Sequence, residues 1–535
     1  MRKITLAGLV LLAAIGCGDL YAGYNLPDET DAGGLCAPGA TAACYTGPPG
    51  TDRVGLCARG TATCNADGMS FGTCQGDVTP KLENCATPVD EDCDGGATAC
   101  MGLPLWSKRF GGDADDQSNR IATTSTGDVI VTGGFSGNVN FGGGLLTSAG
   151  LRDLFIVKLD SATGEHRWSK RFGDHELQPG MVVAIDGGDN ALITGGFSGT
   201  VDFGGGPLTA GPAGALFIAK LDDSGNLLWA KSFDNATAGV GPSLQQCTAI
   251  AAGTDSILVT GCFHDAVDFG GGPLVSTGET DIFVARFDHQ GNYVWAKRFG
   301  DPSDQKSSGM ALDGGGDVLV TGSFLGTIDF GGAPLAASPD GHSLYAARLD
   351  TSGAHVWSKR VGDAAKPQDN ITLTADSSGN PIFTGSLRGV TDFGGGSLTS
   401  AGGVDVFSVK LDAEAAHVFS RRYGDGDDQK GLAVAVDGAG NGLITGAFEG
   451  TLEFGGGLLA SAGAQDVFLA KLDAAGNHLW SKRFGDEFTQ IGTSVAADKD
   501  GNTLLTGQFY GTVDFGNGPL DSAGSSDIFV AKFSP

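Results

Sequence analysis

The phrase Trp106-Ser107-Lys108-Arg109-Phe110-Gly111 sets the organisation of the chain, because versions of it return six more times. A self-similar unit of this kind, rich in glycine and aromatic residues, is typical of a repeat architecture. We therefore expect one supersecondary unit to recur through most of the chain. The later copies, spaced 61 to 66 residues apart, begin at Trp168, Trp229, Trp295, Trp357, Phe419 and Trp480.

The last repeat shows the four strands that we expect in each unit. A short run of small apolar residues at 493–497 is followed by a turn at 498–502, in which glycine and asparagine favour a tight bend. A second strand is predicted at 503–509 and a third at 527–533, with a loop of about seventeen residues between them. The Trp phrase supplies the fourth strand.

The copies of the Trp phrase are out of phase with the other strands. The first copy precedes every other strand, and the chain ends at Pro535 without a copy after the last third strand. A ring explains this offset, because the N-terminal strand then completes the last blade and removes its exposed edge. The sequence predicts an all-β fold, a seven-bladed β-propeller of four-stranded blades over residues 103–535, closed by the strand at 103–110.

The repeated phrases also resemble those of a known family. Residues 103–535, about four fifths of the chain, are similar to the seven-bladed β-propeller repeats of bacterial secreted proteins. The similar phrases are Asp-x-x-Gly-Asn, Thr-Gly-x-Phe, Asp-Phe-Gly-Gly and a version of Phe-Val-Ala-Lys-Leu-Asp at Asp281–Asp288. The resemblance implies the fold and little about activity.

The turns of such a ring belong to two faces, because successive strands run in opposite directions. Short turns join strands one and two and strands three and four on one face, which we call the turn face. The long loops between strands two and three and the crossings from strand four to the next blade lie on the other, the crossing face. We expect a site on the crossing face, and we expect the phenylalanine of each long loop to anchor it between blades.

A glutamine just before strand one recurs in every repeat and predicts a polar ring near the mouth of the central channel. Its amides would offer hydrogen bonds to a glycan, a peptide or water. In the alternative, each glutamine, and the aspartate that follows each Trp phrase, binds an adjacent crossing. The candidate ring consists of Gln117, Gln178, Gln246, Gln305, Gln368, Gln429 and Gln490.

Composition narrows the class of protein. The 535 residues carry a formal net charge of −29, which argues against nucleic acid as a partner because phosphate binding needs a basic footprint. Hydrophobic residues make up 41% of the chain, too many for a disordered protein. The acidic balance is typical of a soluble surface outside the cell.

Residues 1–16 have the features of an export signal. Arg2 and Lys3 precede an apolar run that is too short to span a bilayer as a helix. The phrase Ala14-Ile15-Gly16-Cys17 resembles the bacterial lipoprotein processing box, which implies that Cys17 is lipidated and becomes the new N-terminus. An ordinary signal peptide with a coincidental cysteine is the alternative.

Lipidation at Cys17 would attach the exported chain to a membrane. Residues 17–34 are mostly polar and are predicted to form a flexible tether. Gly18 does not resemble the aspartate that retains some lipoproteins at the inner membrane. The resemblance therefore implies a location at the outer membrane or the cell surface.

Residues 35–101 hold eight of the eleven cysteines and predict a small disulfide module. No Cys-x-x-Cys spacing occurs there, so zinc is not expected. The pairing of eight cysteines cannot be read from sequence, since about 105 connectivities exist. The candidates are Cys36, Cys44, Cys57, Cys64, Cys74, Cys85, Cys93 and Cys100, with a further cross-strand pair expected in blade three between Cys247 and Cys262.

The phrase Asp90-Glu91-Asp92-Cys93-Asp94-Gly95 resembles the opening of a calcium loop. The segment as a whole is similar to Cys-rich leaders of bacterial surface proteins described as metal-binding. Asp90, Asp92 and Asp94 are thus candidate calcium ligands, although Met101 stands where an EF-hand has glutamate. A solvated acidic turn is the alternative.

No catalytic motif stands out in the sequence. We predict a non-enzymatic, lipid-anchored surface protein, whose monomeric propeller is a rigid platform for binding protein or glycan. One alternative is an enzyme that acts on polysaccharide or peptide at the channel mouth. Another is a purely structural component of the cell envelope, since the fold alone does not choose among these functions.

Overall fold

The computed structural model describes residues 36–48, 50–81, 90, 93, 101–176, 178, 181–234, 249–339, 341–363 and 371–535. The chain divides into two compact units, Met1–Cys100 and Met101–Pro535. The predicted signal peptide at 1–16, Cys17 and the tether at 17–34 lie outside the described residues. No described segment forms a helix with the length and hydropathy needed to cross a membrane.

The first unit contains a two-stranded antiparallel sheet of β1 (Thr41–Cys44) and β2 (Gly60–Thr63). Among its described residues, Ala62 is the one buried apolar residue that is not a half-cystine, so covalent links replace a hydrophobic core. Cys85 and Cys100 lie outside the described residues. The predicted disulfide framework is confirmed for six cysteines, which pair as Cys36–Cys64, Cys44–Cys74 and Cys57–Cys93.

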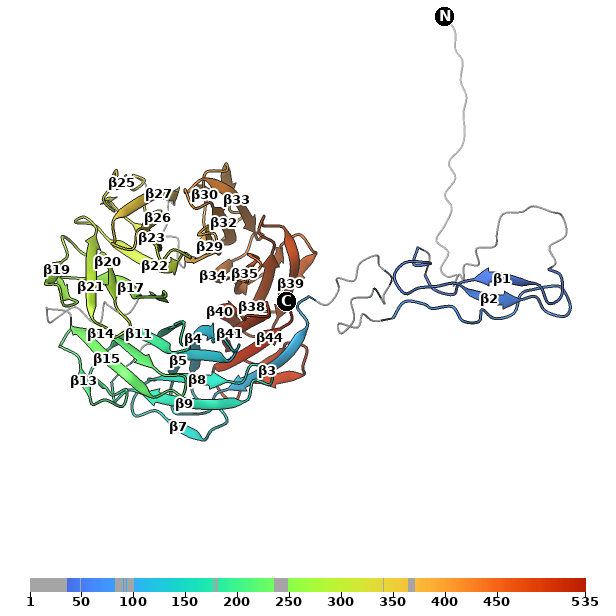
Figure 1. Ribbon diagram of the computed structural model, residues 1–535, viewed down its shortest axis with the longest axis horizontal. Helices are drawn as coiled ribbons and strands as arrows, with labels where there is room; N and C mark the ends of the chain where they lie inside the picture. The colour runs from blue at the N-terminus through green and yellow to red at the C-terminus, as the bar shows by residue number, and fades with distance from the viewer. Residues whose placement is uncertain are drawn as a thin grey trace, which may run out of the picture. The chain divides into compact units, whose positions relative to one another are not determined.

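Seven four-stranded antiparallel sheets form the second unit and surround a central channel (Figure 1). Within six blades the strands follow chain order from the channel outward, and in the seventh the outermost strand comes from the N-terminal end of the unit. The second unit is therefore the seven-bladed β-propeller that the sequence predicts.

The first four blades each have their first strand innermost, beside the channel, and their fourth strand outermost. Blade one contains β4 (Asp116–Thr123), β5 (Val129–Phe135), β8 (Asp153–Leu159) and β9 (His166–Phe172). Blade two contains β10 (Val182–Ile185), β11 (Ala191–Phe197), β14 (Ala215–Leu221) and β15 (Leu227–Asp234). Blade three contains β16 (Ala249–Ala252), β17 (Ile257–Phe263), β20 (Asp281–Phe287) and β21 (Tyr293–Phe299). Blade four contains β22 (Gln305–Leu312), β23 (Val318–Phe324), β26 (Ser343–Leu349) and β27 (His355–Asp363).

The remaining three blades have the same order from the channel outward. Blade five contains β28 (Thr372–Ala375), β29 (Pro381–Leu387), β32 (Asp405–Leu411) and β33 (His417–Tyr423). Blade six contains β34 (Gln429–Val436), β35 (Gly442–Phe448), β38 (Asp466–Leu472) and β39 (His478–Phe484). Blade seven contains β40 (Gln490–Ala497), β41 (Thr503–Phe509), β44 (Asp527–Phe533) and β3 (Pro104–Phe110).

The ring is closed by the first strand of the propeller. β3 pairs antiparallel with β44, with Trp106 opposite Lys532 and Phe110 opposite Ile528. In Figure 1 the blue β3 lies beside the red β44, although the two strands are at opposite ends of the unit in sequence. The predicted closure is confirmed, and it gives blade seven four strands, as in each of the other blades.

Each long loop contains a small two-stranded sheet that the sequence pattern did not predict. These strands have only two or three residues, and glycines and exposed side chains dominate their surroundings, so no alternating pattern marks them. The seven small sheets are β6 (Asn138–Asn140) with β7 (Leu145–Thr147), β12 (Thr200–Val201) with β13 (Leu208–Thr209), β18 (Ala266–Asp268) with β19 (Pro273–Val275), β24 (Thr327–Ile328) with β25 (Leu335–Ala336), β30 (Val390–Asp392) with β31 (Ser397–Thr399), β36 (Thr451–Glu453) with β37 (Leu458–Ala460), and β42 (Thr512–Asp514) with β43 (Pro519–Asp521).

The hydrophobic core lies between the blades. Seven clusters of buried apolar side chains occur among the described residues, one for each pair of neighbouring blades. The recurring Thr-Gly of strand two fits this packing, as Gly507 shows. A Cβ added to Gly507 would lie 1.9 Å from the carbonyl oxygen of Ile491 and 2.5 Å from the ring of Phe529. A side chain there would force strand one away from strand two.

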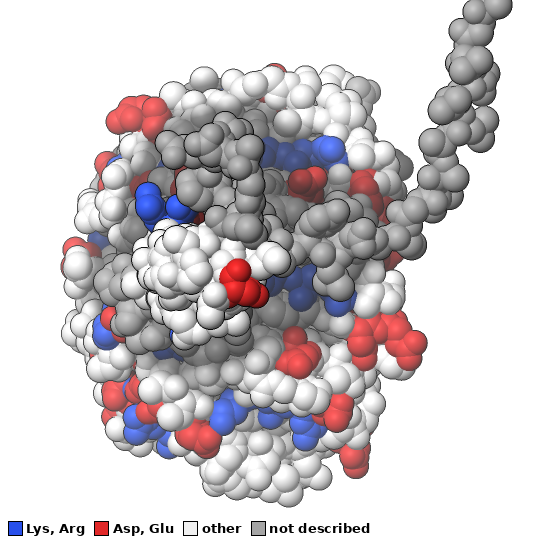
Figure 2. Space-filling view, turned by 90° about the vertical axis from the view of Figure 1, so that its right-hand side faces the viewer, with Lys and Arg blue, Asp and Glu red and all other residues white. Residues whose placement is uncertain are grey.

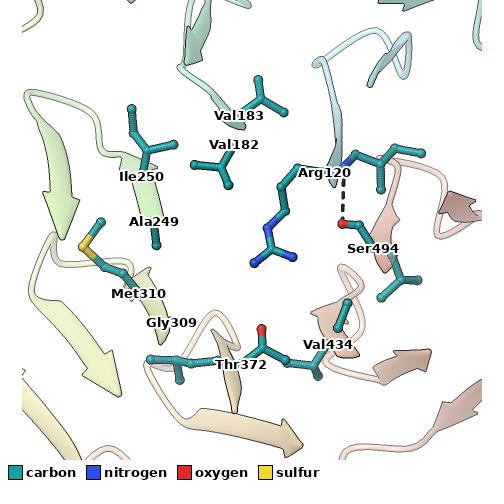
Figure 3. Close-up of a pocket in the computed structure, with 14 residues that line it drawn as sticks. Arg120, Val182, Val183, Ala249, Ile250, Gly309, Met310, Thr372, Val434 and Ser494 are labelled. Atoms are coloured by element: carbon teal, nitrogen blue, oxygen red, sulfur yellow. Dashed lines mark hydrogen bonds between the residues drawn. The ribbon is translucent and has the colours of Figure 1, made fainter. Parts of the chain in front are cut away.

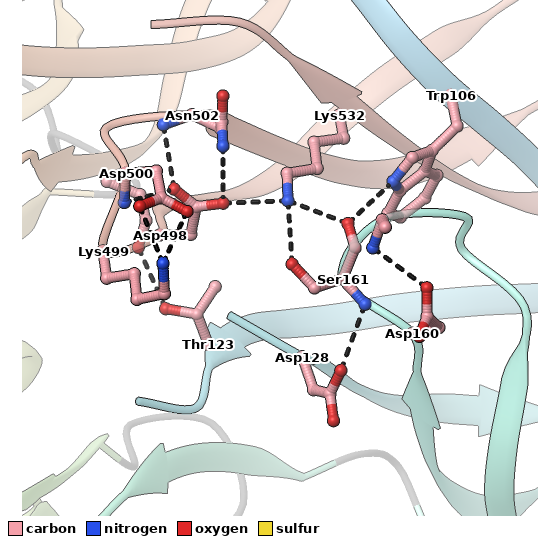
Figure 4. A network of polar contacts seen from close by, with 12 residues as sticks. Trp106, Thr123, Asp128, Asp160, Ser161, Asp498, Lys499, Asp500, Asn502 and Lys532 are labelled. Atoms are coloured by element: carbon pink, nitrogen blue, oxygen red, sulfur yellow. Dashed lines mark hydrogen bonds and ion pairs between the residues drawn. The ribbon is translucent and has the colours of Figure 1, made fainter. Parts of the chain in front are cut away.

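On the turn face, a tryptophan in each of five blades donates a hydrogen bond to the next blade. Figure 4 shows the bond made by Trp106. The indole Nε1 of Trp106 donates to the carbonyl oxygen of Ser161, 3.1 Å away in the turn between strands three and four of blade one. Because this bond crosses a blade boundary, the repeated tryptophan orients neighbouring blades as well as filling the core. The equivalent bonds run from Trp168 to Asp223, Trp229 to His289, Trp295 to Thr351 and Trp357 to Ala413.

Candidate functional site

The glutamines of the predicted ring hold the crossings between blades. Gln305 is fully buried, and its Nε2 donates to Asp301 Oδ1 at 2.7 Å and to the carbonyl oxygen of Leu325 at 3.2 Å. Its Oε1 accepts a hydrogen bond from the backbone N–H of Asp301 at 3.1 Å. Donors and acceptor of this amide are thus used inside the protein.

Asp301 completes the same crossing. Its Oδ2 accepts a hydrogen bond from the backbone N–H of Thr327 at 2.6 Å. Burial by itself would raise the pKa of Asp301, but the hydrogen bonds from Ser303, Thr327 and Gln305 outweigh it and lower the pKa. Asp301 is therefore ionised, and its carboxylate holds the crossing to the loop at Thr327.

The same arrangement recurs at three further glutamines, all fully buried. Their amides bind the preceding crossing aspartate and a loop carbonyl, so they do not offer hydrogen bonds to a ligand in the channel. The ring hypothesis is wrong for these positions, and the alternative of internal bonding holds, because the side chains point into the crossings. The three are Gln178, Gln429 and Gln490, while Gln246 and Gln368 lie outside the described residues.

In blade one the ring position belongs to Asp116 and not to Gln117. Asp116 pairs with Phe135 in the register in which Gln305 pairs with Phe324. Gln117 is one residue further along the strand and accepts a hydrogen bond from Arg152 at 2.8 Å. The sequence carries a signal for this shift, since Gln117 follows Phe110 by seven residues, one more than separates Gln305 from Phe299.

Asp116 is a buried carboxyl where other blades have a neutral amide. Burial raises its pKa to about 7, a hydrogen bond from Gly112 N–H at 2.9 Å opposes the rise, and the neighbouring Asp527 adds to it. Burial also raises the pKa of Asp527, against the ion pair with Arg109. Two acidic groups therefore share one poorly solvated crossing at the point where the ring closes.

The phenylalanine of each long loop is buried, as predicted. Phe141 is 1% exposed, with its ring centroid 4.7 Å from that of Phe155 and 5.2 Å from that of Phe110. These rings pack between blades and present no aromatic surface to a ligand. The matching residues, also buried, are Phe203, Phe269, Phe330, Phe393, Phe454 and Phe515.

The recurring histidines are structural. His166 Nε2 lies 3.0 Å from the hydroxyl oxygen of Ser169, and its ring covers Gly143 of the adjacent loop. Burial lowers the pKa of His166. The same His–Ser pairing recurs on three other outer strands, so these side chains mark a repeat position and do not converge. The three pairs are His355 with Ser358, His417 with Ser420, and His478 with Ser481.

The candidate calcium turn falls mainly outside the described residues. Asp90 is buried, and its carbonyl oxygen accepts a hydrogen bond from Leu56 N–H at 2.8 Å. Asp92 and Asp94 are not described. Within the described part of the chain, no group of three or more His, Cys, Asp or Glu side chains is placed to hold a metal ion.

Cys262 of β17 is disulfide-bonded, and its expected partner Cys247 lies outside the described residues. The Sγ of Cys262 is 3.3 Å from the backbone N–H of Ser307 in the next blade. This cysteine is buried at 1% exposure and belongs to the core between blades three and four.

The innermost strands line a cavity of about 140 Å³ on the channel axis (Figure 3). One residue from each blade faces it at a common register position, opposite the strand-two threonine. Small or neutral side chains hold this position in six blades, and an arginine holds it in blade one. The seven residues are Arg120, Val182, Ala249, Gly309, Thr372, Ala433 and Ser494.

Arg120 breaks the symmetry of the channel. It is the single charged residue among the described residues that line the cavity, and Figure 3 shows its guanidinium extending toward the middle. Burial lowers the pKa of Arg120, yet a guanidinium stays protonated at any ordinary pH. No hydrogen bond or ion pair joins this guanidinium to another described residue. A cation with unused donors therefore lies in a cavity on the ring axis.

Sequence reasoning missed Arg120, although a signal was present. Arg120 precedes the strand-two Thr132 by twelve residues, as Val182 precedes Thr194 and Ser494 precedes Thr506. Aligning the repeats on that threonine would have shown arginine in a column of small residues. Alignment on the glutamines hid it, because blade one is shifted by one residue there.

Charge on the outer surface is mixed. Figure 2 shows acidic and basic side chains interspersed over the face in view. The paired residues include the outer-strand Arg167 with Asp160, which contrasts with the unpaired Arg120 inside the channel.

Comparisons with known proteins found distant relatives only. No family model matches the chain. An uncharacterized WD repeat-containing protein of Acanthamoeba polyphaga mimivirus is 20% identical over 80% of this chain and 38% of its own length. The regulatory protein FlaEY of Caulobacter vibrioides is 21% identical over 44% of this chain and 24% of its own length. The chain thus spans well under half the length of these curated relatives.

Solved structures with some likeness include a Dos1 propeller and an ulvan lyase, a polysaccharide lyase. The Dos1 propeller has a TM-score of 0.40 and 9% identity, over 81% of this chain and 95% of that chain. The ulvan lyase has a TM-score of 0.40 and 12% identity, over 75% of this chain and 93% of that chain.

Proposed function

We propose that the chain is an exported binding protein whose propeller is a rigid platform for a protein or glycan ligand. The observation that carries this proposal is the closed ring itself, in which β3 pairs with β44 and leaves a cavity on the axis. A closed ring holds its inner strands in fixed positions, so little entropy is lost in ordering the site when a ligand binds.

The use of the repeat positions supports binding in preference to catalysis. The described glutamines, histidines and loop phenylalanines that recur in each blade are bound or packed internally. The side chains that could have formed a catalytic group are therefore used by the fold. Arg120 departs from this regularity, and a single arginine binds and orients an anion without a general base or nucleophile beside it.

Export and lipid attachment are part of the proposal. Three disulfide bonds in the first unit are typical of proteins outside the reducing cytoplasm. We propose that Cys17 is lipidated, and that the chain is anchored at the outer membrane or cell surface with residues 17–34 as a tether. The disulfide module would then act as a spacer.

The lipid anchor is tested by metabolic labelling. Cells that express the chain are grown with labelled fatty acid, and Cys17→Ala is compared with the unsubstituted protein. Label in the unsubstituted chain and none in the variant is the expected result. Cys36→Ala serves as a control for loss of a cysteine elsewhere, and equal labelling of all three proteins would end the anchor proposal.

The platform is tested by a binding screen. The full chain is immobilised and exposed to arrays of glycans and of surface proteins, and saturable binding to at least one ligand class is expected. A variant that lacks residues 103–110 is the matched control, since it loses the closing strand of blade seven and keeps the strands of the six remaining blades. Absence of any ligand contradicts the platform, and turnover of a polysaccharide or peptide would favour an enzyme instead.

A further inference from the structure

We propose that the channel binds an oxyanion, carried as the carboxylate of a ligand or present as a free ion, through the guanidinium of Arg120. This deepens the proposed platform function and rests on it for the biological ligand. Arg120 is the one charged residue among the described residues around the cavity.

Arg120 differs from several other arginines in having no anionic partner among the described residues. The other arginines with buried surroundings have partners, as Arg348 does with Asp313 and Arg286 does with Asp255 at 3.0 Å. Arg120 has none among the described residues; its side chain is half-buried in the channel, and burial lowers its pKa. An anion in the cavity would form an ion pair with this half-buried, otherwise unpartnered cation.

The channel beside Arg120 has space for a small ligand group. The residues at the register position of Arg120 include Ala249, Gly309 and Ala433, whose small side chains leave the axis open. The cavity of about 140 Å³ therefore contains the guanidinium and still has room for a small group.

The side chains around the cavity favour the oxygen atoms of an anionic group. A guanidinium presents a planar fork of N–H donors that matches the two oxygens of a carboxylate or of a sulfate. Thr372 and Ser494 line the same cavity, and their hydroxyl groups are further polar neighbours for an oxyanion. The described lining contains no aromatic residue on which a sugar ring would stack. The recognised feature is the anionic group rather than a ring.

Two basic residues lie on the innermost strands near the crossing end of the channel. The innermost strands carry Lys306 in blade four and Lys430 in blade six, three positions before Gly309 and Ala433 in the chain. These lysines lie toward the crossing face, where each inner strand begins.

Binding is measured with simple probes on the full chain. Glucuronate, glucose, acetate and sulfate are titrated at constant ionic strength in a chloride background, and ligand-detected NMR reports occupancy. We expect glucuronate to bind and glucose, which has a similar frame without the charge, not to bind. Acetate binding without sulfate binding identifies a carboxylate site, whereas sulfate binding as tight as that of acetate identifies a site for free oxyanions.

Three variants complete the design. Arg120→Gln should weaken binding about tenfold or more, because a charge-assisted bond is lost. Arg120→Lys should bind with intermediate strength, since it keeps the charge and loses the fork. Arg167→Gln removes the same charge from an exposed outer strand and should bind like the unsubstituted protein.

The outcomes separate this inference from the platform proposal. Equal binding of glucuronate and glucose, or unchanged binding in Arg120→Gln at an unchanged melting temperature, would overturn the anion site. If the screen finds a macromolecular ligand that Arg120→Gln still binds fully, the platform stands and the anion site fails. If glucuronate binds through Arg120 and the screen finds no ligand, the anion site stands and the platform fails.

Discussion

Trp106 and Lys532 are opposite each other across the closing pair of strands, and both donate to the carbonyl oxygen of Ser161. The indole Nε1 of Trp106 lies 3.1 Å from that oxygen and the Nζ of Lys532 lies 2.8 Å from it (Figure 4). Lys532 also forms an ion pair with Asp498 at 2.8 Å. The two ends of the propeller thus meet on a third segment, in blade one, and the closure involves blades seven and one together.

Removing the closing strand should destabilise the whole ring. Deletion of residues 103–110 leaves β44 as an edge strand and removes Trp106 and Phe110 from the core. In the intact protein these two side chains are only 6% and 7% exposed. Burial of each such side chain contributes about 1.5–3 kcal/mol. A much lower melting temperature is expected, measured by calorimetry. Deletion of residues 18–100 is the comparison and should leave the transition of the ring unchanged. A monomer without 103–110 that melts like the full chain would show the closure to be unimportant.

Exchanges of tryptophan and phenylalanine should test how much the hydrogen bond from the indole to the next blade stabilises the protein. Phe419 holds the Trp position of blade five but has no indole N–H, while the carbonyl oxygen of Ala474 in the next blade already accepts Lys410 Nζ at 3.2 Å. Phe419→Trp should add one hydrogen bond and about 0.5–1.5 kcal/mol of unfolding free energy. Trp357→Phe should lose a similar amount, since its bond to Ala413 is 2.8 Å long. Denaturant unfolding measures both.

Trp480 provides the internal control for these exchanges. Its Nε1 is buried without a partner in the described structure, because the turn it would reach is replaced by the two ends of the propeller. Trp480→Phe should therefore cost less than Trp357→Phe. Equal losses at the two positions would mean that the indole fills space and that its hydrogen bond contributes nothing.

Replacing Asp116 by glutamine should stabilise the protein, and more so at higher pH. The folded protein raises the pKa of Asp116 from 3.8 to about 7, so the folded state holds a proton that the unfolded chain releases. Stability contributed by this group is present below pH 3.8 and falls by at most about 1.4 kcal/mol per unit as pH rises toward 7. Asp116→Gln removes that loss. The melting temperature of Asp116→Gln should exceed that of the unsubstituted protein by more at pH 8 than at pH 5.

Asp437→Asn should have the opposite pH dependence. Asp437 pairs with Lys471 at 2.9 Å, and both side chains are 3% exposed. Burial alone would raise the pKa of Asp437, but hydrogen bonds from Asn441 and Lys471 lower it below 3.8. Its contribution is therefore present above pH 3.8 and is lost as pH falls through the lower folded pKa. The variant should be about 3–5 kcal/mol less stable at pH 7, because Lys471 keeps a buried charge.

The exposed Asp500 serves as the control for Asp437. Asp500 pairs with Lys499, and its side chain is 61% exposed, so water screens the pair. Asp500→Asn should change the melting temperature little at any pH. A deficit in Asp437→Asn that stays constant down to acidic pH would argue against ionisation as its cause.

Much of the architecture followed from the chain alone. The number of blades, the four strands in each and the closure by residues 103–110 could be predicted, because the repeats number seven and the Trp phrase is offset by one strand. The anchoring phenylalanines were also predictable, since an aromatic residue that recurs in every unit belongs to the packing. These are periodic features, and a period in sequence becomes a period in space when each unit folds alike.

Other features depended on three-dimensional contacts that no single repeat contains. The pairing of Cys57 with Cys93 depends on which loops meet, and the place of Asp116 depends on one extra residue before β4, which shifts the register. Arg120 looks like an ordinary strand residue until seven inner strands converge and bring it among small neighbours around the axis. The sequence by itself determined the ring, because local periodicity is enough for that. Only the tertiary structure decided where the ring differs from its own symmetry, since an unpaired cation in a channel is defined by its neighbours from other blades.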